Sequence, residues 1–306
     1  MQALRVAIAA AAALLAALTL AAFLARWADP FELLSHFRFQ FAAGAFGLAV
    51  FALIVRAKRT AIAGAALAVL NALPIAIVLS ASAPAAQPGA QETRAIWANL
   101  LGDPRALDHI AALARVHRAD VVALTELPPD GARAVRRAFP DFRCFTTFGA
   151  QTVFTAFIAT RAPCVSTGEA ATERADSPVV FAETAAIRIV AAHPRPPLGP
   201  GAAEERGAVS MAAARAASAG ERPALLLGDF NATPWSPLLS DITRTGLRRA
   251  RCGAPFASTW RSPDPIFGLP IDHAFVGEGL GVVSCRVGPG IGSDHRPLLI
   301  VVAPAS

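Results

Sequence analysis

The sequence has no internal repeat, no glycine-rich motif that would cradle a phosphate, and no Cys-x-x-Cys pair. These absences argue against a repeat architecture, a P-loop or dinucleotide site, and a thiolate metal site. Charged residues are also scarce, at 16% of 306 residues, whereas hydrophobic residues make up 54%. That balance is too apolar for an ordinary soluble protein, so we expect part of the chain to lie in a membrane.

Lysine is absent after residue 89, and positive charge is unevenly distributed. Residues 1–89 carry six basic and two acidic side chains, a net charge of +4, and the remainder carries 22 arginines and 20 acidic residues, a net charge of +2. A nucleic-acid-binding surface should show as clustered basic residues in the folded part. The one dense cluster there is Arg248, Arg249 and Arg251. We interpret it as a solvated surface, so a nucleic-acid footprint is weak.

Three long hydrophobic runs occupy the N-terminal part, at residues 3–24, 39–55 and 61–80. A transmembrane helix needs about 20 apolar residues, and each run is long enough to span a bilayer. The first run alone could be a cleaved signal peptide, because Arg5 lies at its start and small residues abound. The two later runs favour three transmembrane helices instead.

The loop between the second and third runs sets the orientation. It holds Arg56, Lys58 and Arg59 and no acidic residue. By the positive-inside rule this loop lies in the cytoplasm, so the chain after Ser80 lies outside it. The predicted parts are a membrane region, a linker rich in proline, glycine and alanine, and a globular domain, at residues 1–80, 81–92 and 93–306.

Short apolar runs in the globular part predict a core of many strands with few helices. The predicted helices are 104–118, 131–138 and 203–219. The predicted strands are 94–98, 120–125, 142–148, 152–159, 179–184, 186–192, 225–227, 258–260, 271–276, 282–287 and 298–302. Many strands with few intervening helices predict a largely antiparallel, two-sheet α+β core.

Polar residues follow several of these strands. The strongest case is the run Leu225–Leu227, which is followed by Asp229 and Asn231. Side chains alternate along a strand, so both polar groups can point to one side while Phe230 points into the core. Other strands end at Asn99, Glu126, His193, Asp272 with His273, and Asp294 with His295. Loops at one edge of a rigid sheet are where catalytic groups concentrate.

Each of these residues alone has an ordinary explanation as a turn or a cap, but the set resembles the endonuclease/exonuclease/phosphatase superfamily. That superfamily includes DNase I-like nucleases, neutral sphingomyelinases and inositol phosphatases. The matching segments occur in the family's order within residues 94–302; they are Trp97–Leu100, Val121–Glu126, Ala191–His193, Gly228–Asn231, Ile271–His273 and Gly292–His295. The resemblance implies a four-layer αββα sandwich. With the membrane region added, the layout resembles a bacterial group of inner-membrane members of this superfamily.

The resemblance implies a divalent-metal-dependent hydrolase of phosphoesters or phosphodiesters. Glu126, assisted by Asn99 and Asp294, would hold Mg²⁺ or Mn²⁺, hard cations that prefer oxygen ligands. Such an ion neutralises a phosphoryl oxygen and stabilises the leaving group.

The remaining polar residues would perform the chemistry. Asp272 would orient His295, and His295 would be the general base or the imidazolium partner of the phosphate. Asp229 would align or deprotonate the attacking water, and Asn231 and His193 would bind phosphate oxygens. The division of labour between Asp229 and His295 stays open at this point.

Two departures from the family pattern disfavour a DNA-repair nuclease. Leu101 stands where some of those nucleases carry a second acidic metal ligand, and we expect it to contribute packing only. The chain also has no tyrosine to contact the phosphate. The substrate stays open among phospholipid head groups, nucleotides and nucleic acid. The alternative from another class is a catalytically silent member that serves as a binding module in the cell envelope.

The four cysteines all lie in the part predicted to face an oxidising compartment. Four cysteines allow three pairings. We predict Cys144–Cys164 and Cys252–Cys285, because each pair brackets neighbouring predicted strands. The alternative is four buried free thiols.

Overall fold

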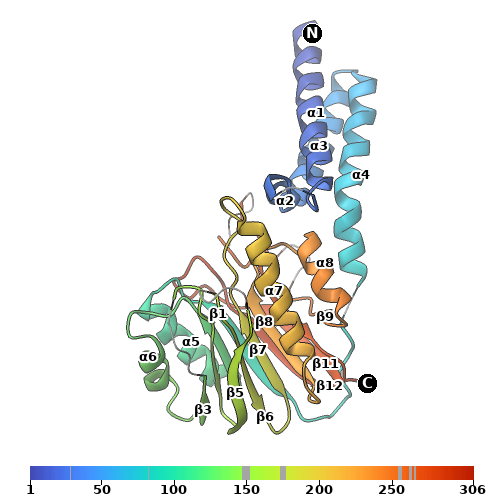
Figure 1. The fold of residues 1–306 in the computed structure, drawn as a ribbon. Coiled ribbons are helices and arrows are strands. Elements are labelled where there is room, and N and C mark those ends of the chain that lie inside the picture. Colours follow the sequence, from blue (N-terminus) through green and yellow to red (C-terminus); the bar gives the residue numbers. More distant parts are fainter. Residues whose placement is uncertain are drawn as a thin grey trace. The chain divides into compact units, whose positions relative to one another are not determined.

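The computed structural model describes residues 1–27, 29–81, 83–146, 152–172, 177–253, 257–261, 264 and 267–306. The chain divides into two compact units, drawn in Figure 1. The first unit comprises residues 1–81 with the segment 233–239, and the second comprises 82–232 and 240–306.

The first unit consists of helices. They are α1 (Gln2–Phe23), α2 (Asp29–Ser35), α3 (Arg38–Ile54) and α4 (Lys58–Ser80). All three hydrophobic runs are therefore helical, as predicted. However, only α1 and α4 are long and apolar enough to be candidate membrane spans, whereas α3 is a shorter apolar helix of 17 residues. Helix α2 fills the predicted loop between the first two runs.

Close contacts join these helices. In α4, Gly64 lies so near α3 that a Cβ at this position would come within 3.0 Å of the Ala45 carbonyl oxygen. Small residues at such points let helix backbones approach each other. Asn71 Nδ2 of α4 donates to Thr19 Oγ1 of α1 over 2.9 Å. The segment 233–239 belongs to this unit because Ser236 Oγ donates to the Glu32 carboxylate of α2.

The second unit has two six-stranded sheets within its described residues. The first sheet, in spatial order, is β11 (Leu280–Val287), β12 (Leu298–Pro304), β1 (Thr93–Asn99), β2 (Val121–Thr125), β4 (Phe157–Thr160) and β3 (Cys144–Phe145). The second is β5 (Cys164–Ala170), β6 (Val179–Thr184), β7 (Arg188–Ala192), β8 (Ala224–Asp229), β10 (Asp272–Val276) and β9 (Arg248–Arg249). The helices are α5 (Pro104–His117), α6 (Gly131–Ala138), α7 (Ala202–Ser218) and α8 (Pro237–Arg244), of which the first three residues of α8 belong to the first unit.

Local sequence explains the central elements. Strands β2, β8 and β10 are buried along their whole length, which matches their apolar runs. Helix α5 begins after Asp103, whose carboxylate accepts the Arg105 N–H, and Pro104 occupies its first position. It ends at Arg118, which adopts the left-handed conformation common at helix ends.

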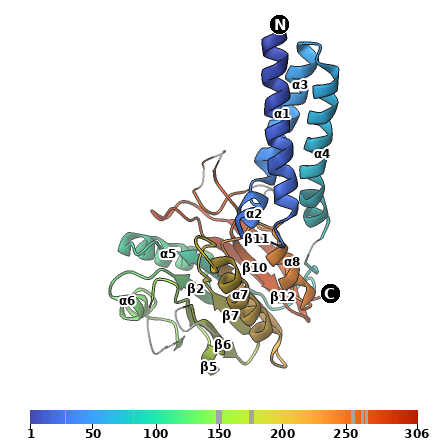
Figure 2. The same cartoon turned by 45° about the horizontal axis from the view of Figure 1, so that its top comes forward.

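The sheets stack face to face around a hydrophobic core. One cluster of buried side chains joins Trp97 and Ala123 of the first sheet to Ile189 and Leu225 of the second. A second cluster packs α5 and α6 on the outer face of the first sheet. Helix α7 packs against β7 and β8 of the second sheet (Figures 1 and 2). The predicted α+β architecture of two sheets with helices is therefore confirmed.

Strand register brings the predicted polar residues to one edge of the sandwich. The pairs β1–β2 and β7–β8 are parallel, so Asn99 lies opposite Thr125, and Ala192 lies opposite Gly228. Strand β10 runs antiparallel to β8 and begins with Asp272 opposite Asp229. We call this edge the site edge: it is formed by the ends of β1, β2, β7 and β8 and by the starts of β4, β10 and β12.

Several strand predictions were wrong in extent. The run 142–148 gives only the two-residue strand β3, with residues 147 and 148 outside the described residues. The run 152–159 begins as a strand only at Phe157, because Thr155 Oγ1 accepts the Thr152 N–H in a turn. The run 258–260 forms only two isolated bridges, both at Trp260, to Leu269 and His295. Strands β5 and β9 and helix α8 were not predicted.

Both predicted disulfides are confirmed: Cys144 pairs with Cys164 and Cys252 with Cys285. Cys144 lies in β3 and Cys164 in β5, which are the terminal strands of the two sheets on one side. Cys285 lies in β11 and Cys252 follows β9, the terminal strands on the other side. Each disulfide therefore joins the two sheets at one of their lateral edges.

Candidate active site

Asp229 and Asn231 are held tightly at the end of β8. Gly228 makes this possible, because a Cβ there would lie 2.6 Å from the Ala192 carbonyl oxygen of β7. Phe230 is fully buried, as predicted. Asn231 adopts a left-handed conformation with φ 48°, its N–H donates to Asp229 Oδ1 over 3.0 Å, and its Nδ2 donates to the Pro194 carbonyl over 3.0 Å.

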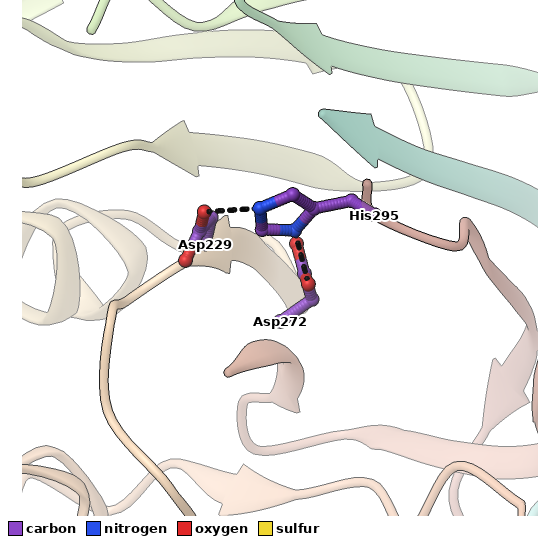
Figure 3. A group of neighbouring side chains, drawn as sticks. All are labelled: Asp229, Asp272 and His295. Atoms are coloured by element: carbon purple, nitrogen blue, oxygen red, sulfur yellow. Dashed lines mark hydrogen bonds and ion pairs between the residues drawn. The ribbon is translucent and has the colours of Figure 1, made fainter. Parts of the chain in front are cut away.

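His295 lies between two carboxylates (Figure 3). Its Nδ1 is 2.9 Å from Asp272 Oδ2, and its Nε2 is 3.6 Å from Asp229 Oδ2. The other oxygen of Asp272 accepts the indole N–H of Trp97 over 2.7 Å. Asp272 is thus fixed by hydrogen bonds on both oxygens, and it orients the imidazole as the sequence implied.

These contacts set the charges of the three groups. Burial lowers the pKa of His295, but the charges of Asp272 and Asp229 outweigh it and raise the pKa to about 10. Burial raises the pKa of Asp272, yet the charge of His295 and the hydrogen bonds from His295, Thr259 and Trp97 hold it below its ordinary value. Burial, followed by the charge of Asp272, raises the pKa of Asp229 to about 7. At neutral pH, His295 is therefore an imidazolium paired with the Asp272 carboxylate, and the neighbouring Asp229 carboxyl titrates close to neutrality.

Glu126 and Asn99 lie next to this group. Glu126 follows β2 in a left-handed conformation with φ 47°. Asn99 Nδ2 donates to Glu126 Oε1 over 2.8 Å and lies 3.4 Å from Asp229 Oδ2. Burial raises the pKa of Glu126 despite the hydrogen bond from Asn99. A non-glycine residue with positive φ at the end of a strand is a common sign of a functional constraint.

His193 completes the cluster from the end of β7. Its Nε2 lies 3.5 Å from Asp229 Oδ2 and 3.9 Å from Glu126 Oε1. Its Nδ1 is 3.0 Å from Thr125 Oγ1, so the hydroxyl can fix which ring nitrogen carries the proton. Burial lowers the pKa of His193 to about 4, which keeps the ring neutral.

Two sets of these side chains lie close enough together to be considered as a metal site. Ligand atoms of Asp229, Asp272 and His295 all lie within 4.8 Å of one another. However, both oxygens of Asp272 already accept strong hydrogen bonds, which a metal would have to displace. The carboxylate of Glu126 is only partly buried, and the Asn99 amide and the Asp229 carboxylate lie beside it. The carboxylate oxygens of Glu126 and Asp229 fit a hard divalent cation, which prefers oxygen ligands. Asn99, by contrast, turns its amide nitrogen toward both carboxylates, and its Oδ1 accepts the Leu101 N–H.

Two polar residues that follow predicted strands make their hydrogen bonds outside this cluster. The carboxylate of Asp294, a predicted metal ligand, is exposed and accepts the indole N–H of Trp260 over 2.9 Å. His273 points elsewhere, and its Nε2 hydrogen-bonds the Ala232 carbonyl over 2.7 Å. Leu101, which was expected to have no ligand role, is 52% exposed and has φ 50°.

The sequence reasoning missed the residues that support the site. Trp97 was part of a matching segment, but no role was assigned to it. Thr125 precedes Glu126 and Thr259 precedes Trp260, and both were hidden among other strand residues. Arg206 of α7 is almost fully buried and donates to the Asn231 carbonyl over 2.7 Å. In the sequence, an arginine within an alanine-rich predicted helix was the one signal that could have pointed to a structural role for Arg206.

The chain is similar in sequence and in fold to known proteins. Residues 96–295 match the model of the endonuclease/exonuclease/phosphatase family. The endonuclease/exonuclease/phosphatase from Bacteroides vulgatus is 19% identical, with 70% of this chain and 99% of that chain covered and a TM-score of 0.57. The mannosyl-6-phosphatase from Bacteroides thetaiotaomicron is 17% identical, with 69% and 99% covered and a TM-score of 0.56.

A third similar structure is TDP2 from D. rerio in complex with a single-strand DNA product. It is 12% identical, with 69% of this chain and 99% of that chain covered and a TM-score of 0.55. No curated protein matches the chain by sequence. At these identities the solved structures establish the shared fold and leave the substrate open.

Proposed function

The chain belongs to the endonuclease/exonuclease/phosphatase family, and from this membership and the site geometry we propose that it is a membrane-anchored, divalent-metal-dependent phosphoester hydrolase acting outside the cytoplasm. The observation that carries the proposal is the convergence of Asp229, His295 and His193 within 3.6 Å contacts, with Glu126 and Asn99 alongside. These groups come from separate strands, and all serve one phosphoryl-transfer chemistry.

In the proposed reaction, a water oxygen attacks phosphorus and the ester P–O bond breaks. Asp229 accepts the proton of the attacking water, since its raised pKa suits a base near neutral pH. The electron pair of the broken bond goes to the leaving oxygen, which takes a proton from solvent water, and Asp229 later returns its proton to solvent. His295, kept as an imidazolium by Asp272, donates from Nε2 to a phosphoryl oxygen and stabilises charge there.

The neighbouring residues bind and orient the phosphate. His193 is neutral, and in the tautomer with its proton on Nε2 the ring accepts the Thr125 hydroxyl at Nδ1 and donates from Nε2 to a second phosphoryl oxygen. The second amide hydrogen of Asn231 serves the same purpose. Glu126, with the amide of Asn99 beside it, would hold Mg²⁺ or Mn²⁺, and the ion would supply neutralisation of phosphoryl charge.

Anchoring and location rest on the first unit and on the disulfides. Helices α1 and α4 have the length and composition of membrane spans. The basic loop before α4 favours a cytoplasmic position for that end of the helix. All four cysteines of the second unit are paired, which favours an oxidising compartment such as the outer side of a bacterial inner membrane.

The test is a substrate panel assayed with full-length protein in detergent. The panel contains a lipid phosphodiester, a nucleotide, a DNA duplex and bis(4-nitrophenyl) phosphate, each with Mg²⁺, Mn²⁺ or excess chelator. We expect metal-dependent hydrolysis, and a loss on the order of 10²–10³-fold or more in Glu126→Gln. Glu278→Gln is the matched control, because Glu278 is exposed in the turn between β10 and β11 at the opposite edge. If no substrate is cleaved by the folded protein, the catalytically silent binding module becomes the better description.

A further inference from the structure

Four loops at the site edge each present a large apolar side chain to solvent. Leu101 follows β1, Val153 precedes β4, Leu198 follows β7 and Phe267 precedes β10. They are 52, 60, 70 and 53% exposed, respectively. Among the described residues of the second unit, the other large apolar side chains with comparable exposure are Val116, Val165 and Val283. Single exposed apolar residues are ordinary, but four on separate loops around one site indicate a shared contact.

The backbone holds one of these side chains outward at a cost. Leu101 has φ 50°, a conformation that side-chain-bearing residues rarely adopt. Its N–H donates to Asn99 Oδ1 over 3.0 Å, so the loop conformation is tied to a residue of the site itself. Such strain is found where a function needs the side chain in that position.

Arginines accompany the apolar side chains on two of these loops. Arg195 shares a loop with Leu198 and stacks on the Phe154 ring at 4.8 Å. Arg261 lies on the segment leading to Phe267 and stacks on the Trp260 ring at 5.5 Å. Apolar side chains with arginines beside them match the surface of a bilayer. The apolar groups enter the boundary between head groups and acyl chains, and the arginines face anionic lipids.

We propose that Leu101, Val153, Leu198 and Phe267 form a lipid-contacting rim, and that the substrate is the phosphoester head group of a bilayer lipid. This inference rests on the proposed hydrolase function and names its substrate class. A bilayer is the partner that the rest of the chain favours, because α1 and α4 have the length and composition of membrane spans. The Pro84 carbonyl already accepts the Val282 N–H of β11, so only residues 81–83 lie between the end of α4 and this attachment, which keeps the second unit near the membrane. Nucleic acid fits less well, since the dense arginine cluster is on β9, away from the rim.

Rim contact is tested without any activity, by fluorescence quenching of full-length protein in nanodiscs of phosphatidylethanolamine and phosphatidylglycerol. Leu198→Cys and Phe267→Cys are labelled with an environment-sensitive dye, and the native cysteines do not react because all are in disulfides. Val116→Cys is the matched control: Val116 is 78% exposed near the end of α5, at the opposite edge. We expect lipids with a nitroxide near the head group to quench the two rim positions at least threefold more than position 116. Equal quenching at positions 198, 267 and 116 would contradict the proposed contact of the rim with the bilayer.

The substrate class is tested by the ratio of two rates in the same nanodiscs, that of a bilayer phospholipid and that of bis(4-nitrophenyl) phosphate. We expect Leu198→Ser with Phe267→Ser to lower this ratio at least tenfold, and Val116→Ser to leave it within twofold. Cleavage of the soluble ester or of DNA without any cleavage of lipid overturns the lipid assignment while the hydrolase function stands. Rim quenching without cleavage of any ester contradicts the hydrolase function alone.

Discussion

Trp97 shows how a single core residue supports the proposed chemistry. It is fully buried between the sheets, and its indole N–H reaches Asp272 Oδ1 over 2.7 Å. A buried carboxylate is stable only when hydrogen bonds or charges compensate for lost hydration. With one oxygen held by Trp97 and the other facing His295, Asp272 stays ionised and fixes the imidazole. The interior packing of the sandwich therefore determines the charge of His295.

The charge of His295 gives a pH-dependent prediction. Its protonated form is present below the raised pKa of about 10 and is lost as the pH rises through that value. Asp272→Asn removes the largest of the effects that raise this pKa, so the alkaline limb of the kcat/KM profile should move to lower pH. The rate at the optimum should fall by roughly 10²–10⁴-fold, as for loss of acid–base function.

The matched control is Asp294→Asn, which removes an exposed acid next in sequence to His295. Asp294 is the smallest of the contributions that raise the pKa of His295, so its alkaline limb should move much less. Profiles are measured with bis(4-nitrophenyl) phosphate, and thermal melts verify that both variants fold. Coincident alkaline limbs in wild type and Asp272→Asn would contradict the assigned role of the Asp272–His295 pair.

At the scale of elements, the two disulfides hold the lateral edges of the sandwich together. One joins β3 to β5 and the other joins the end of β9 to β11, so each connects terminal strands of different sheets. Their sequence separations are 20 and 33 residues. Loops of this size correspond to a stabilisation of about 3–4 kcal/mol per disulfide in the chain-entropy model.

Removal of one disulfide should therefore lower the melting temperature. For a unit of this size, about 2–4 °C per kcal/mol gives a decrease of about 6–14 °C for the Cys144→Ala with Cys164→Ala variant. Calorimetry of full-length protein in detergent measures it, and Cys252→Ala with Cys285→Ala should give a similar decrease. As a control, the variant lacking all four cysteines should melt at the same temperature with and without reductant. A wild-type melt unaffected by complete reduction would show that the disulfides add no stability.

The elements also show where sequence reasoning succeeds. Strands β6 and β10 and helix α6 lie where apolar runs or helical periodicity predicted them, because burial of the whole strand or of one helix face leaves a clear pattern. Strand β5 was missed because most of its residues are exposed or half-exposed and it contains serine, threonine and glycine. The two-residue strand β9 has too few residues for any period. The turn before β4 was misread because threonines that form turns also have high strand propensity.

The site follows the same rule. Polar residues at strand ends could be recognised in sequence, since the apolar runs before them are unambiguous. Register then decides which of them meet: Asp229 and Asp272 do, whereas His273 points away because neighbouring side chains alternate. The long-range contact between Trp97 and Asp272, 175 positions apart, depends on how the two sheets stack, and no local pattern reports it.

For the whole molecule, the number of membrane spans is the main question. Helix α3 has 17 residues, at the lower limit for crossing a bilayer. However, only Val55, Arg56 and Ala57 separate it from α4, and Gly64 of α4 lies directly against Ala45 and Ala49 of α3. Two helices joined by so short a turn run antiparallel, so α3 lies along α4 through whatever medium α4 crosses. The three-span hypothesis therefore has α3 cross the bilayer alongside α4, although α3 is shorter than the two candidate spans.

The count of spans decides the topology, and reporter fusions can read it. With three spans and the Arg56–Arg59 loop in the cytoplasm, the N-terminus is cytoplasmic and the second unit lies outside. With α1 and α4 as the only spans, the N-terminus and the second unit would share one side. Fusion after Ala90 should therefore give active alkaline phosphatase and no cytoplasmic fluorescence, whereas a fluorescent protein fused before Met1 should fluoresce. The variant Arg56→Glu with Arg59→Glu tests the role of the basic loop: with its positive charge removed, the preference for a cytoplasmic loop should weaken and phosphatase activity after Ala90 should fall. Active phosphatase after Ala90 without fluorescence from the N-terminal fusion would contradict three spans, and cleavage near residue 24 would identify α1 as a signal peptide.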